Sequence, residues 1–198
     1  MRKFLFILCL LVPLTSCSLW NDVGYASRSG RLVKQYGGKK TRPDYAAHRF
    51  VVLRRSGTKE RLTLTYYKKG SYNPAALRKI NKLFRDRLTG RIGKIDPELI
   101  DFMVDIRTRL GLPPTVEFIV LSGYRAPESN RKLRRSNKQV AKNSYHLRGW
   151  AVDFKIPHVN GKAIAEIAKT MQRGGVSYYP SSNHVHVDLG NIRTWRPK

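Results

Sequence analysis

Two runs of alternating apolar and polar positions open the patterned part of the chain. Residues 48–54 and 61–67 are rich in Val, Leu, Thr and Tyr, and the polar connection between them, residues 56–60, contains a glycine. Alternation with a period of two residues is typical of strands, and a connection of this length is typical of a hairpin. We therefore predict a β-hairpin at this point.

Two helical patterns follow the hairpin. Each begins with a capping residue and a proline, Asn73-Pro74 and Asp96-Pro97, and continues with apolar residues three or four positions apart. The Asn or Asp side chain can accept hydrogen bonds from the free N–H groups of a first turn, where proline lacks an N–H to leave unpaired. The buried faces are predicted to be Leu77, Ile80, Leu83 and Phe84 in the first helix, and Leu99, Phe102, Met103, Ile106 and Leu110 in the second, with Gly111 as its stop.

Five further elements are predicted after the Pro113-Pro114 break. The patterns indicate strands at 116–121, 150–155 and 183–189, a strongly basic helix at 128–141, and a short amphipathic helix at 163–171. Helices and strands come in separate blocks, without the regular strand–helix–strand repeat of parallel folds. We therefore predict an α+β fold in which helices flank a mainly antiparallel sheet.

The first seventeen residues have the pattern of a bacterial export signal. Two basic residues precede an apolar run, residues 4–14, that is too short to span a bilayer. Leu14-Thr15-Ser16-Cys17 resembles a lipobox, in which the signal is cut before Cys17 and this cysteine carries a lipid. Ser18 in the next position favours the outer membrane in Gram-negative lipoproteins. The alternative is an ordinary secretory signal in which Cys17 has no role.

The cysteine count excludes a disulfide, and the composition and length of the remaining segments indicate a tether and one domain. Cys9 lies in the apolar run, so the processed chain would contain no cysteine besides Cys17 and no disulfide within the chain. Residues 18–46 are polar, glycine-containing and basic, which predicts a flexible tether. Residues 47–198 have the size and apolar content of one domain with its own core. We predict that this domain carries the activity.

The chain is strongly basic, with a formal net charge of +26. Removal of the predicted signal leaves 37 basic and 13 acidic residues, a net charge of +24. Such a field is typical of nucleic-acid binders, but the export signal and the lack of any known nucleic-acid-binding motif argue against that partner. Acidic wall polymers, lipopolysaccharide or anionic lipid fit the charge better.

Candidate chemistry gathers in the second half of the chain. Three of the five histidines, His146, His184 and His186, occur there together with Asp153. Neutral imidazole and carboxylate groups are the ligands that zinc accepts at catalytic sites, where one position stays open for water. A single histidine in a strand is usually a structural residue, but this combination predicts a metal site.

Strand geometry supports this prediction. In the strand at 150–155, Asp153 lies on the face opposite the apolar residues, and in the strand at 183–189 the two histidines share the polar face with Asp188. Pairing of the two strands would therefore bring Asp153 close to His186.

The motifs resemble those of a known superfamily. His146 with Asp153, the later His186 and the upstream Ser122-Gly123-Tyr124-Arg125 resemble the LAS-type zinc peptidases of the D-Ala-D-Ala carboxypeptidase and VanX kind. The resemblance is closer to the YcbK/MepK murein endopeptidases and covers about residues 48–196. Its further motifs are Leu83-Phe84-Arg85-Asp86, Ile95-Asp96-Pro97, Gly174-Gly175-Val176, and Asp188-Leu189-Gly190 with Arg193 and Trp195.

The resemblance implies a hedgehog/D-Ala-D-Ala peptidase-like site in which His146, Asp153 and His186 bind Zn²⁺. Arg125 would bind the scissile carbonyl oxygen or a substrate carboxylate, because its planar guanidinium supports charge-assisted pairing. The implied activity is hydrolysis of cross-links between peptidoglycan stem peptides in the periplasm, including those between two meso-diaminopimelate residues. A D,D-carboxypeptidase and a non-catalytic peptidoglycan-binding lipoprotein are the alternatives.

The identity of the proton carrier stays open at this point. Relatives of the carboxypeptidase and VanX type have an acidic residue three positions before the last ligand, where this chain has Asn183. We favour His184, which resembles the His-x-His arrangement of a related endopeptidase group. Asp188 is the second candidate, although its position suits a group that orients a ligand histidine.

Overall fold

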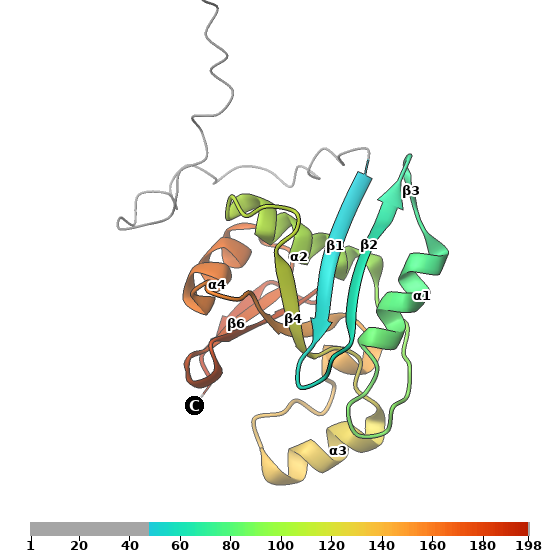
Figure 1. Cartoon of the computed structure of the whole chain (residues 1–198). Helices are drawn as coiled ribbons and strands as arrows, with labels where there is room; N and C mark the ends of the chain where they lie inside the picture. The colour runs from blue at the N-terminus through green and yellow to red at the C-terminus, as the bar shows by residue number, and fades with distance from the viewer. Residues whose placement is uncertain (1–47, 198) are drawn as a thin grey trace, which may run out of the picture.

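The computed structural model describes residues 48–197. The predicted export signal at 1–17, the lipidation site Cys17 and the tether at 18–46 lie outside the described residues. The described part forms one eight-stranded mixed sheet with four α-helices (Figure 1), which confirms the α+β prediction. None of the described helices combines the length and apolar character that a membrane span requires.

The elements follow the predicted order, with three strands added, β3, β6 and β8. The strands are β1 (His48–Arg55), β2 (Arg61–Lys68), β3 (Ser71–Tyr72), β4 (Glu117–Ser122), β5 (Ala151–Lys155), β6 (Gly175–Tyr179), β7 (His184–Asp188) and β8 (Arg193–Trp195). The helices are α1 (Pro74–Leu83), α2 (Pro97–Arg109), α3 (Pro127–Ser136) and α4 (Gly161–Thr170), together with the 3₁₀ helices η2 (Tyr145–Arg148) and η3 (Pro180–Ser182).

The strand order in the sheet is β3-β2-β1-β4-β5-β7-β6-β8. The β1–β2 hairpin is antiparallel as predicted, while β1–β4 and β6–β8 are parallel pairs. The chain returns to the free side of β1 through α1 and α2, and this crossover gives β4 the same direction as β1. The sheet is therefore mixed.

The core lies on one face of the sheet. Apolar side chains from the central strands and from α1, α2 and α4 form one buried cluster, and the predicted stripe residues Ile80, Leu99 and Ile106 are fully buried in it. The predicted caps are also present, since Asn73 accepts hydrogen bonds from two backbone amides of α1 and Asp96 accepts one from Glu98. The opposite face of β5 and β7 is left free for polar side chains.

The basic helix is shorter than predicted. The pattern predicted helix over 128–141, but α3 ends at Ser136. Asn137 is extended, and its side chain accepts the amide of Gln139, a local hydrogen bond that competes with helix continuation. Asn130 then holds the returning chain by donating to the carbonyls of Ala141 and Lys142. The helix stands apart from the rest of the domain, below the sheet (Figure 1).

Candidate metal centre

Three side chains from separate segments meet on the polar face of the sheet. β5 and β7 pair antiparallel with Asp153 opposite His186, so the predicted convergence is confirmed. His146 approaches from η2, which precedes β5. One ligand atom from each of these three residues lies within 4.8 Å of the others.

The short η2 turn places His146. Its C-terminal cap, Gly149, has φ 69° and packs so tightly on the backbone of Lys94 that a Cβ atom would lie 1.9 Å from the Lys94 carbonyl oxygen. Only glycine combines that backbone conformation with such a close approach. Ser144 caps the other end, since its hydroxyl accepts the His146 amide at 3.4 Å.

The tautomer of His146 follows from its surroundings. Its Nδ1 lies 2.7 Å from the carbonyl oxygen of Gly123, which can only accept, so Nδ1 carries the proton. Nε2 keeps its lone pair and faces Asp153, 3.4 Å from Oδ2. Burial lowers the pKa of His146, which keeps the ring neutral and able to act as a ligand.

His186 is oriented through its other ring nitrogen, Nε2. Its Nε2 lies 2.9 Å from Asp188 Oδ2, and its Nδ1 lies 2.9 Å from Asp153 Oδ1. Burial alone would lower the pKa of His186, but the hydrogen bonds to the two carboxylates outweigh it and raise the pKa to about 9. A proton on Nδ1 thus occupies the position, between His186 and Asp153, that a metal ion would take.

Asp188 is the group that orients His186. It is fully buried and accepts hydrogen bonds from the amides of Gly175 and Gly190, at 3.0 and 2.9 Å. Arg193 pairs with both of its oxygens, at 3.0 and 2.7 Å. Burial raises the pKa of Asp188, but the hydrogen bonds from His186 and Arg193 outweigh it and hold the pKa below its usual range. The carboxylate therefore only accepts, and the Nε2 of His186 must donate to it.

The donor set fits zinc. It consists of two imidazole nitrogens and one carboxylate, and each histidine is oriented through its other nitrogen by an acceptor behind it. Burial raises the pKa of Asp153, but the neighbouring His146 and His186 hold it well below the usual range, so the carboxylate is anionic. All three residues also line one cavity of the domain.

That cavity has a volume of about 800 Å³. The chain segment after α3 forms part of its wall, and three arginines and three aromatic side chains also line it: Arg125, Arg193, Arg196, Tyr145, Tyr179 and Trp195. A cleft of this size, with a few charged groups among aromatic side chains, is typical of a substrate site.

Arg125 contributes a cation to the cavity. It follows β4 as predicted, and its amide donates to the His146 carbonyl at 3.1 Å, which fixes the loop beside the metal centre. Its guanidinium contacts only neutral groups, Asn130 Oδ1 at 3.2 Å and Ser122 Oγ at 3.5 Å. Burial lowers the pKa of Arg125, yet arginine remains charged. No described carboxylate forms an ion pair with it, so its charge is available to an anionic ligand.

His184 also lines the cavity, next to the metal centre in the sheet. Its ring stacks on Tyr179, with centroids 4.3 Å apart, and its Nδ1 lies 2.6 Å from the Ser182 hydroxyl. Burial lowers the pKa of His184, so the imidazole is largely neutral near pH 7. A neutral, oriented imidazole at the cavity wall can accept a proton.

Asn183 does not replace the acidic residue of the carboxypeptidase-type relatives. Its backbone is left-handed, with φ 51°, and its side chain accepts the Gly161 amide at 2.8 Å and donates to the Val159 carbonyl at 3.2 Å. These bonds hold it against the start of α4. It is not among the described residues that line the cavity.

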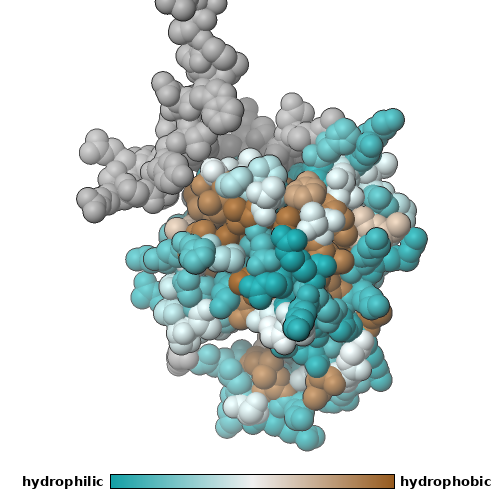
Figure 2. Space-filling model, viewed as in Figure 1, coloured by the Kyte–Doolittle hydropathy of each residue, from teal (hydrophilic) through white to brown (hydrophobic). Residues whose placement is uncertain are grey.

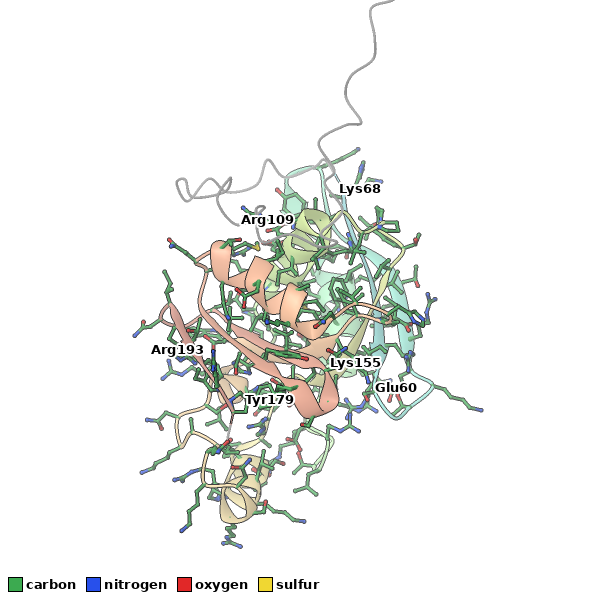
Figure 3. All side chains as sticks on the ribbon, turned by 90° about the vertical axis from the view of Figure 1, so that its left-hand side faces the viewer. Glu60, Lys68, Arg109, Lys155, Tyr179 and Arg193 are labelled. Atoms are coloured by element: carbon green, nitrogen blue, oxygen red, sulfur yellow. The ribbon has the colours of Figure 1, made fainter. Side chains whose placement is uncertain are left out.

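Sequence reasoning assigned no role to several cavity residues. Tyr179 lies opposite His184 in the β6–β7 ladder, so the alternation of residues 176–179 could have placed it on the site face. Arg193 and Trp195 belong to β8, which is too short to show a period; the Trp195 ring lies 5.1 Å from that of His186. Tyr179 and Arg193 lie at the end of the sheet that faces α3 (Figure 3).

The chain is similar to known proteins over most of its length. The family model described as peptidoglycan L,D-endopeptidase MepK matches residues 44–195. A probable peptidoglycan L,D-endopeptidase MepK from Haemophilus influenzae is 40% identical over 148 residues, which cover 75% of this chain and 79% of that protein. The peptidoglycan L,D-endopeptidase MepK of Escherichia coli K12 is 39% identical over 150 residues, 74% of this chain and 80% of that protein. No solved structure gives a significant match.

Proposed function

This chain belongs to the peptidoglycan L,D-endopeptidase MepK family, and from that premise we propose that it is a zinc-dependent murein endopeptidase that cuts peptide cross-links of the cell wall. The observation that carries the proposal is the orientation of the two histidine rings around Asp153. His146 and His186 each present an unprotonated nitrogen toward Asp153, once a metal replaces the proton on His186. Two imidazoles and a carboxylate arranged in this way form the donor set that zinc accepts at catalytic sites.

Zinc would be held by Nε2 of His146, a carboxylate oxygen of Asp153 and Nδ1 of His186. When bound, it supplies an activated water at neutral pH and polarises the scissile carbonyl. Arg125 binds the carbonyl oxygen as negative charge develops on it, since the guanidinium has no other anionic partner among the described residues. The Gly123 carbonyl and Asp188 keep the two imidazole rings in their ligating orientation.

His184 is the proton carrier in this proposal. It lies at the cavity wall and is neutral near pH 7, so it can take a proton from the attacking water and deliver it to the leaving amine. Asp188 is fully buried behind His186, where it cannot reach a substrate in the cavity. Its role is to position the ligand.

The substrate is a cross-link between stem peptides, including one that joins two meso-diaminopimelate residues. Support comes from the names of the relatives and from the cations of the cavity, which suit a peptide with free carboxylates. Arg125 lies next to His146, and Arg196 is a second arginine of the cavity lining. A cross-link has substrate on both sides of the scissile bond, and a cavity of about 800 Å³ can accommodate it.

The protein acts outside the cytoplasm, anchored by a lipid on Cys17 at the outer membrane, with residues 18–46 as a tether. The signal-like pattern of residues 1–17 and a cell-wall substrate support this placement. Labelling with a palmitate analogue should mark the wild type and not Cys17→Ala. An unlabelled wild type in a lipoprotein-competent cell would make the protein a soluble secreted one.

Digestion of purified cross-linked muropeptides tests the activity. The protein should convert dimers to monomers, lose this activity to a chelator and regain it with zinc, and mass spectrometry of the products identifies the bond. Release of terminal D-alanine alone would make the protein a carboxypeptidase. Binding of muropeptides without any product would make it a wall-binding lipoprotein.

A further inference from the structure

The segment of residues 127–142, which we name the cationic lobe, concentrates positive charge beside the cavity. It contains α3 and the chain that returns from it, with six basic residues: Arg131, Lys132, Arg134, Arg135, Lys138 and Lys142. Its one acidic residue, Glu128, pairs with Arg91 at 2.9 Å. All six basic side chains are exposed, and none forms an ion pair within the described residues.

Most of these cations do not hold the lobe in place. Asp86 anchors the start of α3 by accepting from the Ala126 amide at 3.0 Å and the Ser129 hydroxyl at 2.8 Å. Only Ser129 and Asn130 of the helix are buried. Arg131 and Arg135 are four positions apart, a spacing at which like charges repel and weaken a helix. Arg134 donates from Nε to the Val140 carbonyl at 3.2 Å and so helps to hold the returning chain. The other five side chains form no ion pair within the described residues, and their charges remain available to an anion.

The lobe is also part of the site. Five of its residues line the same cavity as the metal centre: Leu133, Asn137, Gln139, Val140 and Ala141. Figure 2 shows the surface around α3 as mostly hydrophilic, with small apolar areas. β1 begins at the opposite end of the domain (Figure 1), so the lobe faces away from the point where the N-terminal segment enters.

We propose that the cationic lobe binds free carboxylates of peptidoglycan stem peptides that neighbour the one in the cavity. This inference rests on the proposed function, which brings intact wall polymer to the cavity. A polymer presents many stem peptides at once, so several of their carboxylates can pair weakly with basic side chains of the lobe. These pairs keep the polymer bound and raise the local concentration of its cross-links at the cavity. Exposed pairs are screened by salt, so the contribution should fade as ionic strength rises. A soluble dimer, which has no neighbouring stem peptides, should gain nothing from the lobe.

The test compares two triple variants of the full chain. The lobe variant carries Arg131→Gln, Lys132→Gln and Lys138→Gln. The control variant carries Arg78→Gln, Lys79→Gln and Lys68→Gln, which removes the same side-chain types from positions outside the lobe. Lys68 lies at the end of the domain away from α3 (Figure 3).

Affinity for intact sacculi at low salt should fall about tenfold in the lobe variant, from roughly twofold for each of three exposed charge pairs. It should stay near the wild-type value in the control variant. Sacculi whose carboxylates are blocked as amides should bind the wild type as weakly as the lobe variant binds untreated sacculi. Equal sacculus binding by the two triple variants, or undiminished wild-type binding to amidated sacculi, would overturn the proposal.

Two further measurements distinguish the lobe from the active site and from a membrane contact. Turnover of the soluble cross-linked dimer should be the same in all three proteins, and a wild type that fails to cut it refutes the proposed function instead of the lobe. Binding to vesicles of anionic phospholipid is measured in parallel. A lobe variant that loses vesicle binding and keeps sacculus binding would show that the lobe serves a membrane, which overturns the proposal.

Discussion

Replacement of Asp188 by asparagine removes one charge without changing the shape of the side chain. Asp188 receives five donors: Oδ1 accepts from the amides of Gly175 and Gly190 and from Arg193, while Oδ2 accepts from His186 and Arg193. An asparagine must place its own NH₂ group on one of these two sides. The Oδ2 side is less unfavourable, because it faces two donors instead of three.

The Asp188→Asn substitution changes which nitrogen of His186 carries the proton. With an NH₂ group on that side, His186 can pair with the asparagine only by accepting at Nε2, which moves its proton to Nδ1 and removes the lone pair that would bind zinc. Loss of such an orienting group weakens metal binding by about 10- to 100-fold, or about 1.4–2.8 kcal/mol. The donors left unpaired, among them Arg193, cost about 1–3 kcal/mol of folding free energy.

Zinc affinity is measured by competition with a chromophoric chelator, and the free energy of unfolding by urea denaturation of the metal-free protein. Asp96→Asn is the matched control, because Asp96 only caps α2 and asparagine caps a helix equally well. The control should bind zinc as the wild type does. If Asp188→Asn also binds zinc with wild-type affinity, the tautomer argument is wrong.

Three further changes probe other parts of the account. His184→Ala should keep its zinc and lose about 10²- to 10⁴-fold in muropeptide turnover, and full turnover with full zinc would exclude His184 as the proton carrier. Gly149→Ala should destabilise the fold by about 2–4 kcal/mol in urea denaturation, because its backbone is left-handed and its Cβ would meet the Lys94 carbonyl. Burial raises the pKa of Asp86, but donors from Thr89, Ala126 and Ser129 outweigh it and hold the pKa below its usual value. The stability that Asp86 contributes is therefore present above pH about 4 and is lost as the pH falls through its folded pKa, and Asp86→Asn should remove this part of the acid dependence.

The pairing of the two strands at the candidate metal centre could be predicted from the sequence. Alternation in residues 150–155 and 183–189 fixed the faces of two strands, and their pairing brings Asp153 opposite His186 as predicted. The helix starts were equally accessible, because the Asn73 and Asp96 caps act within a few residues of themselves. A strand period of two residues, a helix period of 3.6 residues and the local capping chemistry were sufficient to predict these strands and helix starts.

Features that depend on distant partners could not be predicted. The pairing of Arg193 with Asp188 needs β8, a three-residue strand whose place beside β6 has no pattern in the sequence. The parallel pairing of β1 with β4 depends on how two helices cross between them. The path of the chain after α3 depends on Asn130, which donates to the distant carbonyls of Ala141 and Lys142.

The helix α2 shows the same limit. The apolar face predicted for this helix does not include Asp101 or Asp105, yet both are buried. Tyr66 and Tyr72 donate to Asp101 at 2.7 and 2.5 Å, and Arg49 pairs with both aspartates. These partners come from the β1–β3 region, well before α2 in the chain. A buried carboxylate with distant partners looks, in sequence, like a surface residue.

Zinc content and cleavage of cross-linked muropeptides, measured on the same samples, test the central claim most directly. The wild type should hold one zinc per chain, and its cleavage rate should follow the zinc content through chelation and readdition. His146→Ala, Asp153→Ala and His186→Ala should each be depleted of zinc and inactive while remaining folded. Full cleavage by the metal-free protein, or full zinc occupancy in any of these three variants, would contradict the account.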